Sequence, residues 1–138
     1  MNILLVEDNE YKANDIVCAL ITCSDGDFDI TVTKSRNGAL HELADAYEAD
    51  AMYDLVILDM QLPLFENQPG KILPEGGLHI LEEIKRCKYN TIVAFCSGEQ
   101  VDCDDAIMCI KYDSSVYMVP IIEELITKVK QRIAQGGN

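Results

Sequence analysis

The sequence predicts a three-layer α/β/α domain, in which a doubly wound parallel sheet of five strands carries helices on both faces. Short apolar runs such as residues 3–6 (ILLV) and 55–58 (LVIL) lack polar alternation, which is typical of strands buried on both sides. Segments with a helical spacing of apolar residues alternate with these runs, and this order favours a parallel sheet. The length of 138 residues suits one domain.

The strands are predicted from runs of apolar and β-branched residues that are bounded by polar or turn residues. The fifth run, AIMCI, would be apolar all round if it were a helix, so we interpret it as a buried strand that ends in Lys111. The predicted strands are residues 3–6, 30–33, 55–58, 91–96 and 106–110.

Helices are predicted where apolar residues recur every three or four positions behind a capping residue. Asp8 or Asn9 can cap the first helix, and Ser35 or Asn37 can cap the second. An early fifth strand reduces the helix before it to a turn or two within residues 99–105. The third and last helices are predicted over residues 77–87 and 121–133, and the apolar face of the first helix is formed by Ala13, Ile16, Val17, Leu20 and Ile21.

The composition argues against two classes of partner. Eleven basic residues against 24 acidic ones give a net charge of −13, so no basic stripe is available for nucleic acid, and an anionic membrane surface is also disfavoured. The six cysteines form no C-x-x-C pair. We therefore interpret them as reduced thiols of a cytoplasmic protein and not as zinc ligands. The expected organisation is one domain over residues 1–134 and a disordered tail over residues 135–138.

Three carboxylates follow two of the predicted strands. Glu7 and Asp8 come directly after residues 3–6, and Asp59 comes directly after residues 55–58. Ligands of open parallel sheets bind beyond the carboxyl ends of the strands. If these strands are neighbours, three anions share one small area, and a divalent cation such as Mg²⁺ would offset their repulsion. The alternative is that the acids only cap the following helices.

Four segments carry a resemblance to a known family: MNILLVEDNE, DLVILDMQLP, GLHILEEIKR and TIVAFCSG. The acidic pair after the first strand and the D-x-x-x-P after the third are similar to the receiver domain of bacterial two-component response regulators. This resemblance implies a flavodoxin-like sheet with the strand order 2-1-3-4-5. It implies that Asp59 accepts a phosphoryl group and that the hydroxyl of Ser97 binds it. The implied Mg²⁺ ligands are the carboxylates of Glu7, Asp8 and Asp59 and the backbone carbonyl of Gln61.

The resemblance also implies a function. A histidine kinase or phosphotransfer protein would donate the phosphoryl group, and the signal would leave through contact with a downstream protein target or by onward phosphotransfer. The chain would not be a conventional enzyme, because it would catalyse only its own phosphoryl transfer and the slow hydrolysis of its aspartyl phosphate. The side chains of Gln61 and Glu99 would tune that hydrolysis.

Two rival functions compete with this one. Phosphatases of the haloacid dehalogenase type also use a strand-end aspartate, but they carry a second aspartate two residues later, where this chain has Gln61. The alternative that stays open is a protein-interaction module that keeps the receiver fold and is not controlled by phosphorylation.

The first departure from the receiver pattern concerns a lysine. A receiver carries this lysine at the end of its fifth strand, before a proline, but the residue before Pro120 is Val119. Lys111 is the preferred candidate, and its alternative is an ordinary surface lysine. The aromatic switch residue of the family matches Tyr117 under one alignment and Tyr112 under the other.

The second departure is a long loop over residues 64–76, between the third strand and the third helix. It holds two prolines and shows little periodicity, and long loops in compact domains are often functional. Phe65, Ile72 and Leu73 give it apolar anchors. We interpret it first as a surface for a partner, with a lid or an insertion without effect as alternatives.

Overall fold

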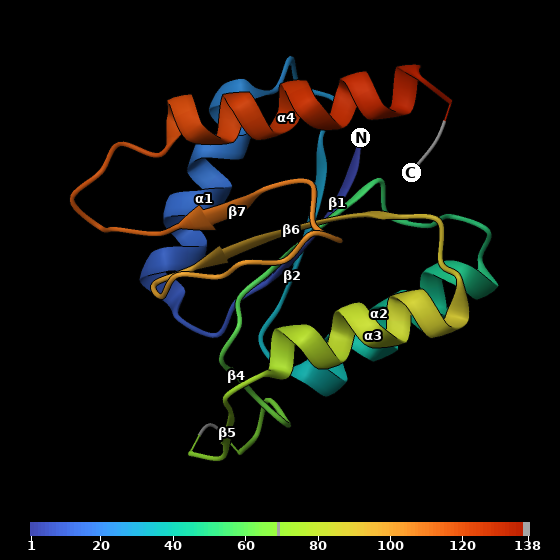
Figure 1. Ribbon diagram of the computed structural model, residues 1–138, viewed down its shortest axis with the longest axis vertical. Helices are drawn as coiled ribbons and strands as arrows, with labels where there is room; N and C mark the ends of the chain where they lie inside the picture. The colour runs from blue at the N-terminus through green and yellow to red at the C-terminus, as the bar shows by residue number, and fades with distance from the viewer. Residues whose placement is uncertain (69, 137–138) are drawn as a thin grey trace.

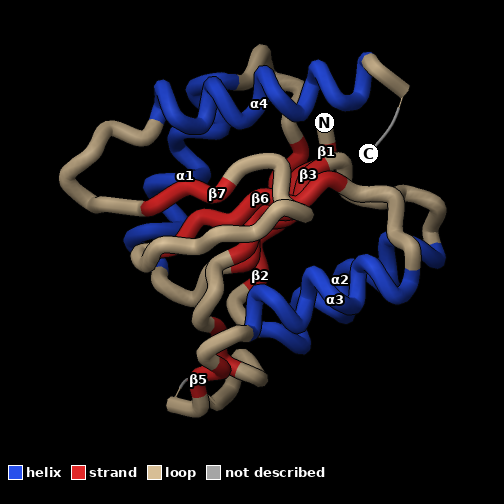
Figure 2. The backbone as a smooth tube through the Cα atoms, in the orientation of Figure 1, coloured by secondary structure: helices blue, strands red, loops and turns tan. Residues whose placement is uncertain are grey.

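The computed structural model describes residues 1–68 and 70–136. One parallel sheet has the order β2-β1-β3-β6-β7, which is the predicted order 2-1-3-4-5 when the strands of this sheet are counted along the chain. Figures 1 and 2 show its twisted strands at the centre of the molecule. The strands are β1 (Asn2–Val6), β2 (Asp29–Thr33), β3 (Leu55–Leu58), β6 (Ile92–Ser97) and β7 (Cys109–Lys111).

Helices cover both faces of the sheet, as the sequence predicts (Figure 1). Helices α1 (Glu10–Cys23) and α4 (Val119–Ala134) lie on one face, and α2 (Arg36–Glu48) and α3 (Gly76–Cys87) lie on the other. Successive strand residues point to opposite faces. In β1, for example, Leu5 packs with the α1/α4 layer and Leu4 with the α2/α3 layer. The unbroken apolar runs are therefore explained by burial on both sides.

Side-chain caps fix the start of two helices. Asn9 accepts a hydrogen bond from the backbone N–H of Lys12 at 2.9 Å, and Ser35 accepts one from Gly38 at 2.9 Å. These are one member of each predicted pair of caps, and each is worth about 1 kcal/mol. The Asn9 cap also sets where α1 begins, which decides the side chains that this helix presents beyond the end of β1.

The connection from β6 to β7 has no helix (Figure 2). Residues 98–108 contain a turn at Asp104 and Asp105 and otherwise run as irregular chain, in line with the turn predicted within residues 99–105. An ion pair of 2.9 Å between Lys85 and Asp105 links this segment to α3. The fifth strand is shorter than predicted, because only Cys109–Lys111 pairs as β7. One face of β7 is thus left without a covering helix.

The segment predicted as a long loop contains a small hairpin. Strands β4 (Leu62–Pro63) and β5 (Ile72–Leu73) pair in antiparallel fashion. The backbone N–H of Asn37 donates to the carbonyl of Leu64 at 3.1 Å, which ties the hairpin to the start of α2. The hairpin projects from the end of the molecule near α3 (Figure 1).

The tail predicted over residues 135–138 lies partly outside the described residues, because residues 137 and 138 are not described. Residues 135 and 136 form a turn at the end of α4, where Gln135 is the C-cap. Among the helices that the structure describes, none combines the length and the apolar character that a membrane crossing requires.

Candidate functional site

The register of β1 and β3 brings three acids together. Val6 pairs with Leu58 at the ends of these neighbouring strands, so Glu7 and Asp59 leave the sheet side by side. The N–H of Asp59 still donates to the carbonyl of Val6 at 3.2 Å, which extends the ladder by one residue. Carboxylate oxygens of Glu7, Asp8 and Asp59 all lie within 4.8 Å of one another. The sequence-based expectation of one shared acidic pocket therefore agrees with the geometry.

Burial changes the acid–base behaviour of this cluster. Glu7 is 2% exposed, and desolvation, followed by the charge of Asp59, raises the pKa of Glu7 to about 7 despite the opposing effect of Lys12. Burial also raises the pKa of Asp8. Both shifts arise mainly from burial, with the neighbouring Asp59 carboxylate as a further cause, and clustered groups with shifted pKa values are typical of functional sites.

A lysine that the sequence analysis did not single out lies inside this pocket. Lys12, in the first turn of α1, is 7% exposed. Its Nζ lies 2.7 Å from Oε1 of Glu7 and 3.3 Å from Oδ1 of Asp59, and it donates to the backbone carbonyl of Cys96 at 2.7 Å. Burial lowers the pKa of Lys12, but the charges of Glu7 and Asp59 outweigh that effect, and the net pKa is raised. Lys12 is therefore a buried ammonium.

The spacing of the helix contains a signal that identifies Lys12. Ile16 and Leu20 form the buried stripe of α1, and Lys12 stands four residues before Ile16, on the same stripe. A lysine on an apolar stripe must find an anionic partner or shift its pKa. The side chains of a helix also tilt toward its N-terminus, which points Lys12 to the edge of the sheet where the acids lie.

The acids line an open cleft at the carboxyl edge of the sheet. The cleft has a volume of about 670 Å³. A neighbouring hollow of about 220 Å³ is lined by Asp59, Gln61, Ser97, Gly98 and Glu99. The predicted residues Gln61 and Ser97 thus share a hollow with Asp59. The larger cleft is lined by Glu7, Asp8, Asn9, Tyr11, Lys12, Asp59, Gln61, Ile72, Gly98, Tyr112 and Ser114.

Neither sequence candidate for the receiver lysine position lines these two hollows. Lys111 pairs in register with Ser97, but its side chain is exposed. Val119 begins α4 and packs against the α1/α4 core. Of the two aromatic candidates, Tyr112 lines the cleft and Tyr117 is 71% exposed. The cation that the geometry places beside Asp59 is therefore Lys12.

Helix α3 approaches Asp59 through a glycine. A β-carbon on Gly77 would overlap the backbone carbonyl oxygen of Asp59 and would lie 2.9 Å from the ring of Phe95. The N–H of Gly77 also donates to the carbonyl of Met60 at 2.9 Å. The N–H of Met60 in turn donates to Oδ1 of Asp59 at 2.8 Å. The absence of a side chain at Gly77 thus lets α3 support the loop that carries Asp59.

The donor set of the pocket fits a hard divalent cation. Three carboxylates face one ammonium, which leaves an excess of negative charge. Oε1 of Glu7 is buried and accepts no well-directed hydrogen bond within the described residues, although the ammonium of Lys12 lies 2.7 Å away. Three clustered carboxylates are the ligand type that Mg²⁺ and Mn²⁺ prefer.

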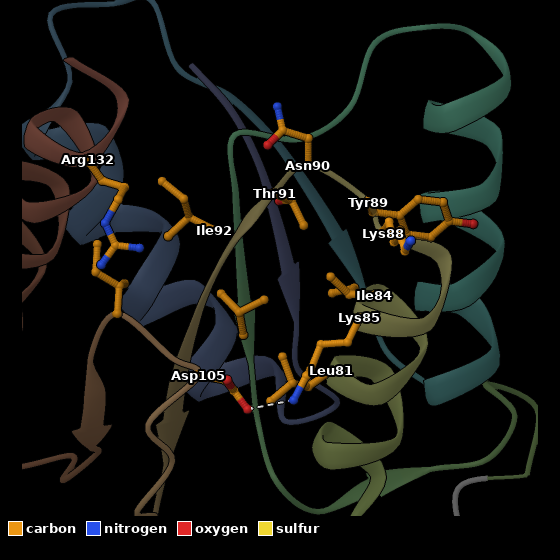
Figure 3. A pocket seen from close by; sticks show the side chains of 12 residues that line it. Leu81, Ile84, Lys85, Lys88, Tyr89, Asn90, Thr91, Ile92, Asp105 and Arg132 are labelled. Carbon is orange, nitrogen blue, oxygen red and sulfur yellow. Dashed lines mark hydrogen bonds and ion pairs between the residues drawn. The ribbon is translucent and has the colours of Figure 1, made fainter. Parts of the chain in front are cut away.

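A separate hollow of about 350 Å³ lies at the other end of the sheet (Figure 3). The end of α3, the start of β6 and Arg132 of α4 enclose it, and the Lys85–Asp105 ion pair crosses it. Oγ1 of Thr91 has no hydrogen-bond partner among the described residues, but this atom is itself fully buried. A ligand in the hollow would therefore not reach this atom.

Comparisons with known proteins show which solved structures this chain resembles. No protein-family model matches the sequence, and no curated protein sequence matches it. A phosphorylated cyanobacterial phytochrome response regulator, RcpA, is 23% identical with a TM-score of 0.68, over 90% of this chain and 89% of that chain. The Mn²⁺-bound form of the response regulator Rcp1 is 19% identical with a TM-score of 0.69, over 91% of both chains.

A two-component response regulator from Cytophaga hutchinsonii is 15% identical with a TM-score of 0.71, over 94% of this chain and 96% of that chain. These structures agree with the present one over nearly their whole length. At this level of identity the comparison concerns the fold. The chain therefore has the fold of a response regulator receiver domain.

Proposed function

We propose that this chain is a phosphorylation-switched receiver that accepts a phosphoryl group on Asp59. The observation that carries the proposal is the convergence of Glu7, Asp8 and Asp59 within 4.8 Å at the carboxyl edge of the sheet. An open cleft beside them gives a phosphoryl donor access to Asp59. The donor would be a phosphohistidine on a histidine kinase or phosphotransfer protein.

The transfer is a displacement at phosphorus. An oxygen of the Asp59 carboxylate forms a bond to phosphorus while the bond from phosphorus to the donor histidine nitrogen breaks. The electron pair of that bond stays on the imidazole, which takes up a proton from water. The N–H of Met60 and the ammonium of Lys12 both contact Oδ1 of Asp59, so Oδ2, which makes neither contact, is the oxygen that we assign to the attack.

Glu7, Asp8, Asp59 and the backbone carbonyl of Gln61 would hold Mg²⁺. When bound, this ion supplies neutralisation of the charge on the transferring oxygens. The Mn²⁺-bound form of Rcp1, a protein of the same fold, supports a divalent metal. The cluster of Glu7, Asp8 and Asp59 carboxylates supports the same assignment in this chain.

Ser97 would convert the added charge into a change of surface. Its side chain is buried, and its Oγ accepts a hydrogen bond from the N–H of Glu99 at 3.3 Å. A phosphoryl group on Asp59 would attract the Ser97 hydroxyl, because both residues line the same hollow. That movement would pull on residues 98–108, which contain no helix of their own, and would alter the surface offered to a protein target.

The six cysteines are free, and this supports a cytoplasmic location, where kinases of this class place their phosphohistidine. Gln61 and Glu99 line the hollow beside Asp59, from which they would tune the hydrolysis of the aspartyl phosphate.

The competing function is an interaction module without a phosphoryl switch. It is favoured by one observation, the exposure of Lys111 at the place where receivers carry the site lysine.

The two functions are separated by incubation with acetyl phosphate and MgCl₂, followed by intact-mass spectrometry. We expect the wild-type chain to gain one phosphoryl group, EDTA to prevent the gain, and Asp59→Asn to abolish it. Asp54→Asn is the matched control, because Asp54 is a carboxylate at the opposite end of β3, and it should gain the group normally. No gain in the wild-type chain at any Mg²⁺ concentration would support the interaction module.

A further inference from the structure

We propose that Lys12 is the residue that binds the phosphoryl group on Asp59, from the first helix instead of the last strand. This inference rests on the proposed function of Asp59. In the resting structure the ammonium of Lys12 already lies 3.3 Å from Oδ1 of Asp59. A phosphoryl group attached to that carboxylate would place its oxygens within reach of the same ammonium.

The position of Lys12 in the first turn of α1 directs its side chain toward Asp59. Lys12 is the third residue of the helix, and its N–H is bonded to the Asn9 cap. From the first turn, a side chain that tilts toward the helix N-terminus extends over the carboxyl end of the sheet. The hydrogen bond from Nζ to the carbonyl of Cys96 then fixes the ammonium between β1, β3 and β6.

Two features of this lysine are unfavourable for stability. A cation in the first turn opposes the helix dipole, whose N-terminal end is positive. Burial of the ammonium adds a desolvation cost, which is met only because Glu7 and Asp59 lie beside it. An apolar side chain of similar length would avoid both costs, but it would leave the buried carboxylates of Glu7 and Asp59 without their cation. Departures of this kind from local preference are expected where a residue has a functional task.

The alternation of β7 explains why Lys111 does not take this role. Ile110 packs with the α1/α4 layer and Cys109 with the α2/α3 layer, so Lys111 points to the same side as Cys109. On that side no helix lies between β6 and β7 to hold its side chain over the site. Tyr112, one residue later, is on the side of α1 and packs with that layer.

Tyr112 also contacts the ammonium of Lys12. Nζ of Lys12 lies 5.5 Å from the centroid of its ring, within the range of a cation–π contact. The hydroxyl of Tyr112 donates to Oδ2 of Asp15 at 2.9 Å, and Asp15 stands on the same helix one turn after Lys12. The end of β7 therefore contributes an aromatic wall to the site, while the first helix contributes the cation.

The experiment compares Lys12→Met with Lys111→Met, which removes the same charge at the end of β7. The initial rate of phosphoryl gain from acetyl phosphate is measured by intact mass at a Mg²⁺ concentration that saturates each protein, as established by calorimetry. Thermal unfolding followed by circular dichroism checks the fold of both variants. We expect Lys111→Met to match the wild-type chain and Lys12→Met to be slower by on the order of 10²-fold.

A measurement without substitution at the site keeps the inference testable if Lys12→Met does not fold. Beryllofluoride, which mimics a phosphoryl group on a carboxylate, is titrated with Mg²⁺ into wild-type protein labelled at lysine. We expect the NMR signal of the Lys12 side chain to shift when beryllofluoride binds, and the NMR signal of the Lys111 side chain to stay in place. Equal rates for Lys12→Met and the wild-type chain, or an unshifted Lys12 signal with bound beryllofluoride, would overturn the inference while leaving the proposed function intact. Absence of phosphoryl gain in the wild-type chain would overturn both.

Discussion

The backbone of Gly77 packs directly on the backbone carbonyl of Asp59, with no room for a side chain between them. We therefore expect Gly77→Ala to lower the free energy of unfolding by roughly 1–3 kcal/mol, because the new methyl group would force α3 away from the loop of Asp59. Urea unfolding measures the change. Gly98→Ala is the matched control, since a β-carbon on Gly98 meets no atom within 4 Å. Equal effects of the two substitutions would contradict the close packing of α3.

The buried ion cluster leads to a metal-dependent prediction. In EDTA, Lys12→Met should lower the free energy of unfolding by about 1–3 kcal/mol, because the carboxylates of Glu7 and Asp59 lose their cation while they stay buried. Mg²⁺ should then stabilise the variant more than it stabilises the wild-type chain. The change in melting temperature on adding MgCl₂ gives the comparison. Lys111→Met should change the free energy of unfolding by less than about 0.5 kcal/mol. An equal loss of stability in that variant would contradict the specific role of Lys12 in the buried ion cluster.

The pair formed by Tyr112 and Asp15 should be energetically coupled. Burial, followed by the hydrogen bond and charge of Asp15, raises the pKa of Tyr112, so its hydroxyl stays protonated and donates. A double-mutant cycle with Tyr112→Phe and Asp15→Ala should give a coupling energy of roughly 0.5–1.5 kcal/mol in urea unfolding. Tyr112→Phe should leave phosphoryl acceptance unchanged, because the ring over Lys12 remains. Additive effects of the two substitutions would mean that the hydrogen bond does not form in solution.

Cys96 gives a prediction that depends on pH. Burial raises the pKa of the Cys96 thiol from 9.0 to about 12. The unfolded chain therefore loses this proton at a lower pH than the folded chain. The contribution of Cys96 to stability is constant below about pH 8 and declines as pH rises above 9.0, by up to about 1.4 kcal/mol for each pH unit. Cys96→Ala should remove this part of the alkaline decline in urea unfolding.

Alkylation of the thiols provides an independent check on the same residue. At pH 8 iodoacetamide should modify the exposed Cys18 and leave the buried Cys96 intact in the folded protein. Peptide mapping after the reaction distinguishes the two sites. Modification of Cys96 at the rate of Cys18 would show that β6 is more open than the structure has it.

The sheet could be predicted from the sequence because the physical signal is strong. Runs such as residues 55–58 and 92–96 are apolar throughout, which is typical of strands between two layers of helices. The carboxylates of Glu7, Asp8 and Asp59 could be brought together for the same reason, since parallel neighbours end at one edge. In the structure, the pairing of Val6 with Leu58 places the ends of β1 and β3 at the same level, so the acids that follow these strands lie together.

Lys12 was missed because the receiver pattern carries its site lysine on the last strand. The face on which a strand residue points depends on where the strand begins, and β7 starts three residues later than predicted. The short connection between β6 and β7 was predicted, but its effect on Lys111, whose side chain no helix holds over the site, is a tertiary property. The hairpin of β4 and β5 was missed as well, because two-residue strands around Pro63 carry no detectable period.

The most direct test of the account is to locate the phosphoryl group on the chain. Protein treated with acetyl phosphate and Mg²⁺ is reduced with borohydride, which converts a phosphorylated aspartate to homoserine, and the digested peptides are sequenced by mass spectrometry. The account predicts homoserine at position 59, in the wild-type chain and not in EDTA-treated protein. Homoserine at another aspartate, or at none, would contradict it.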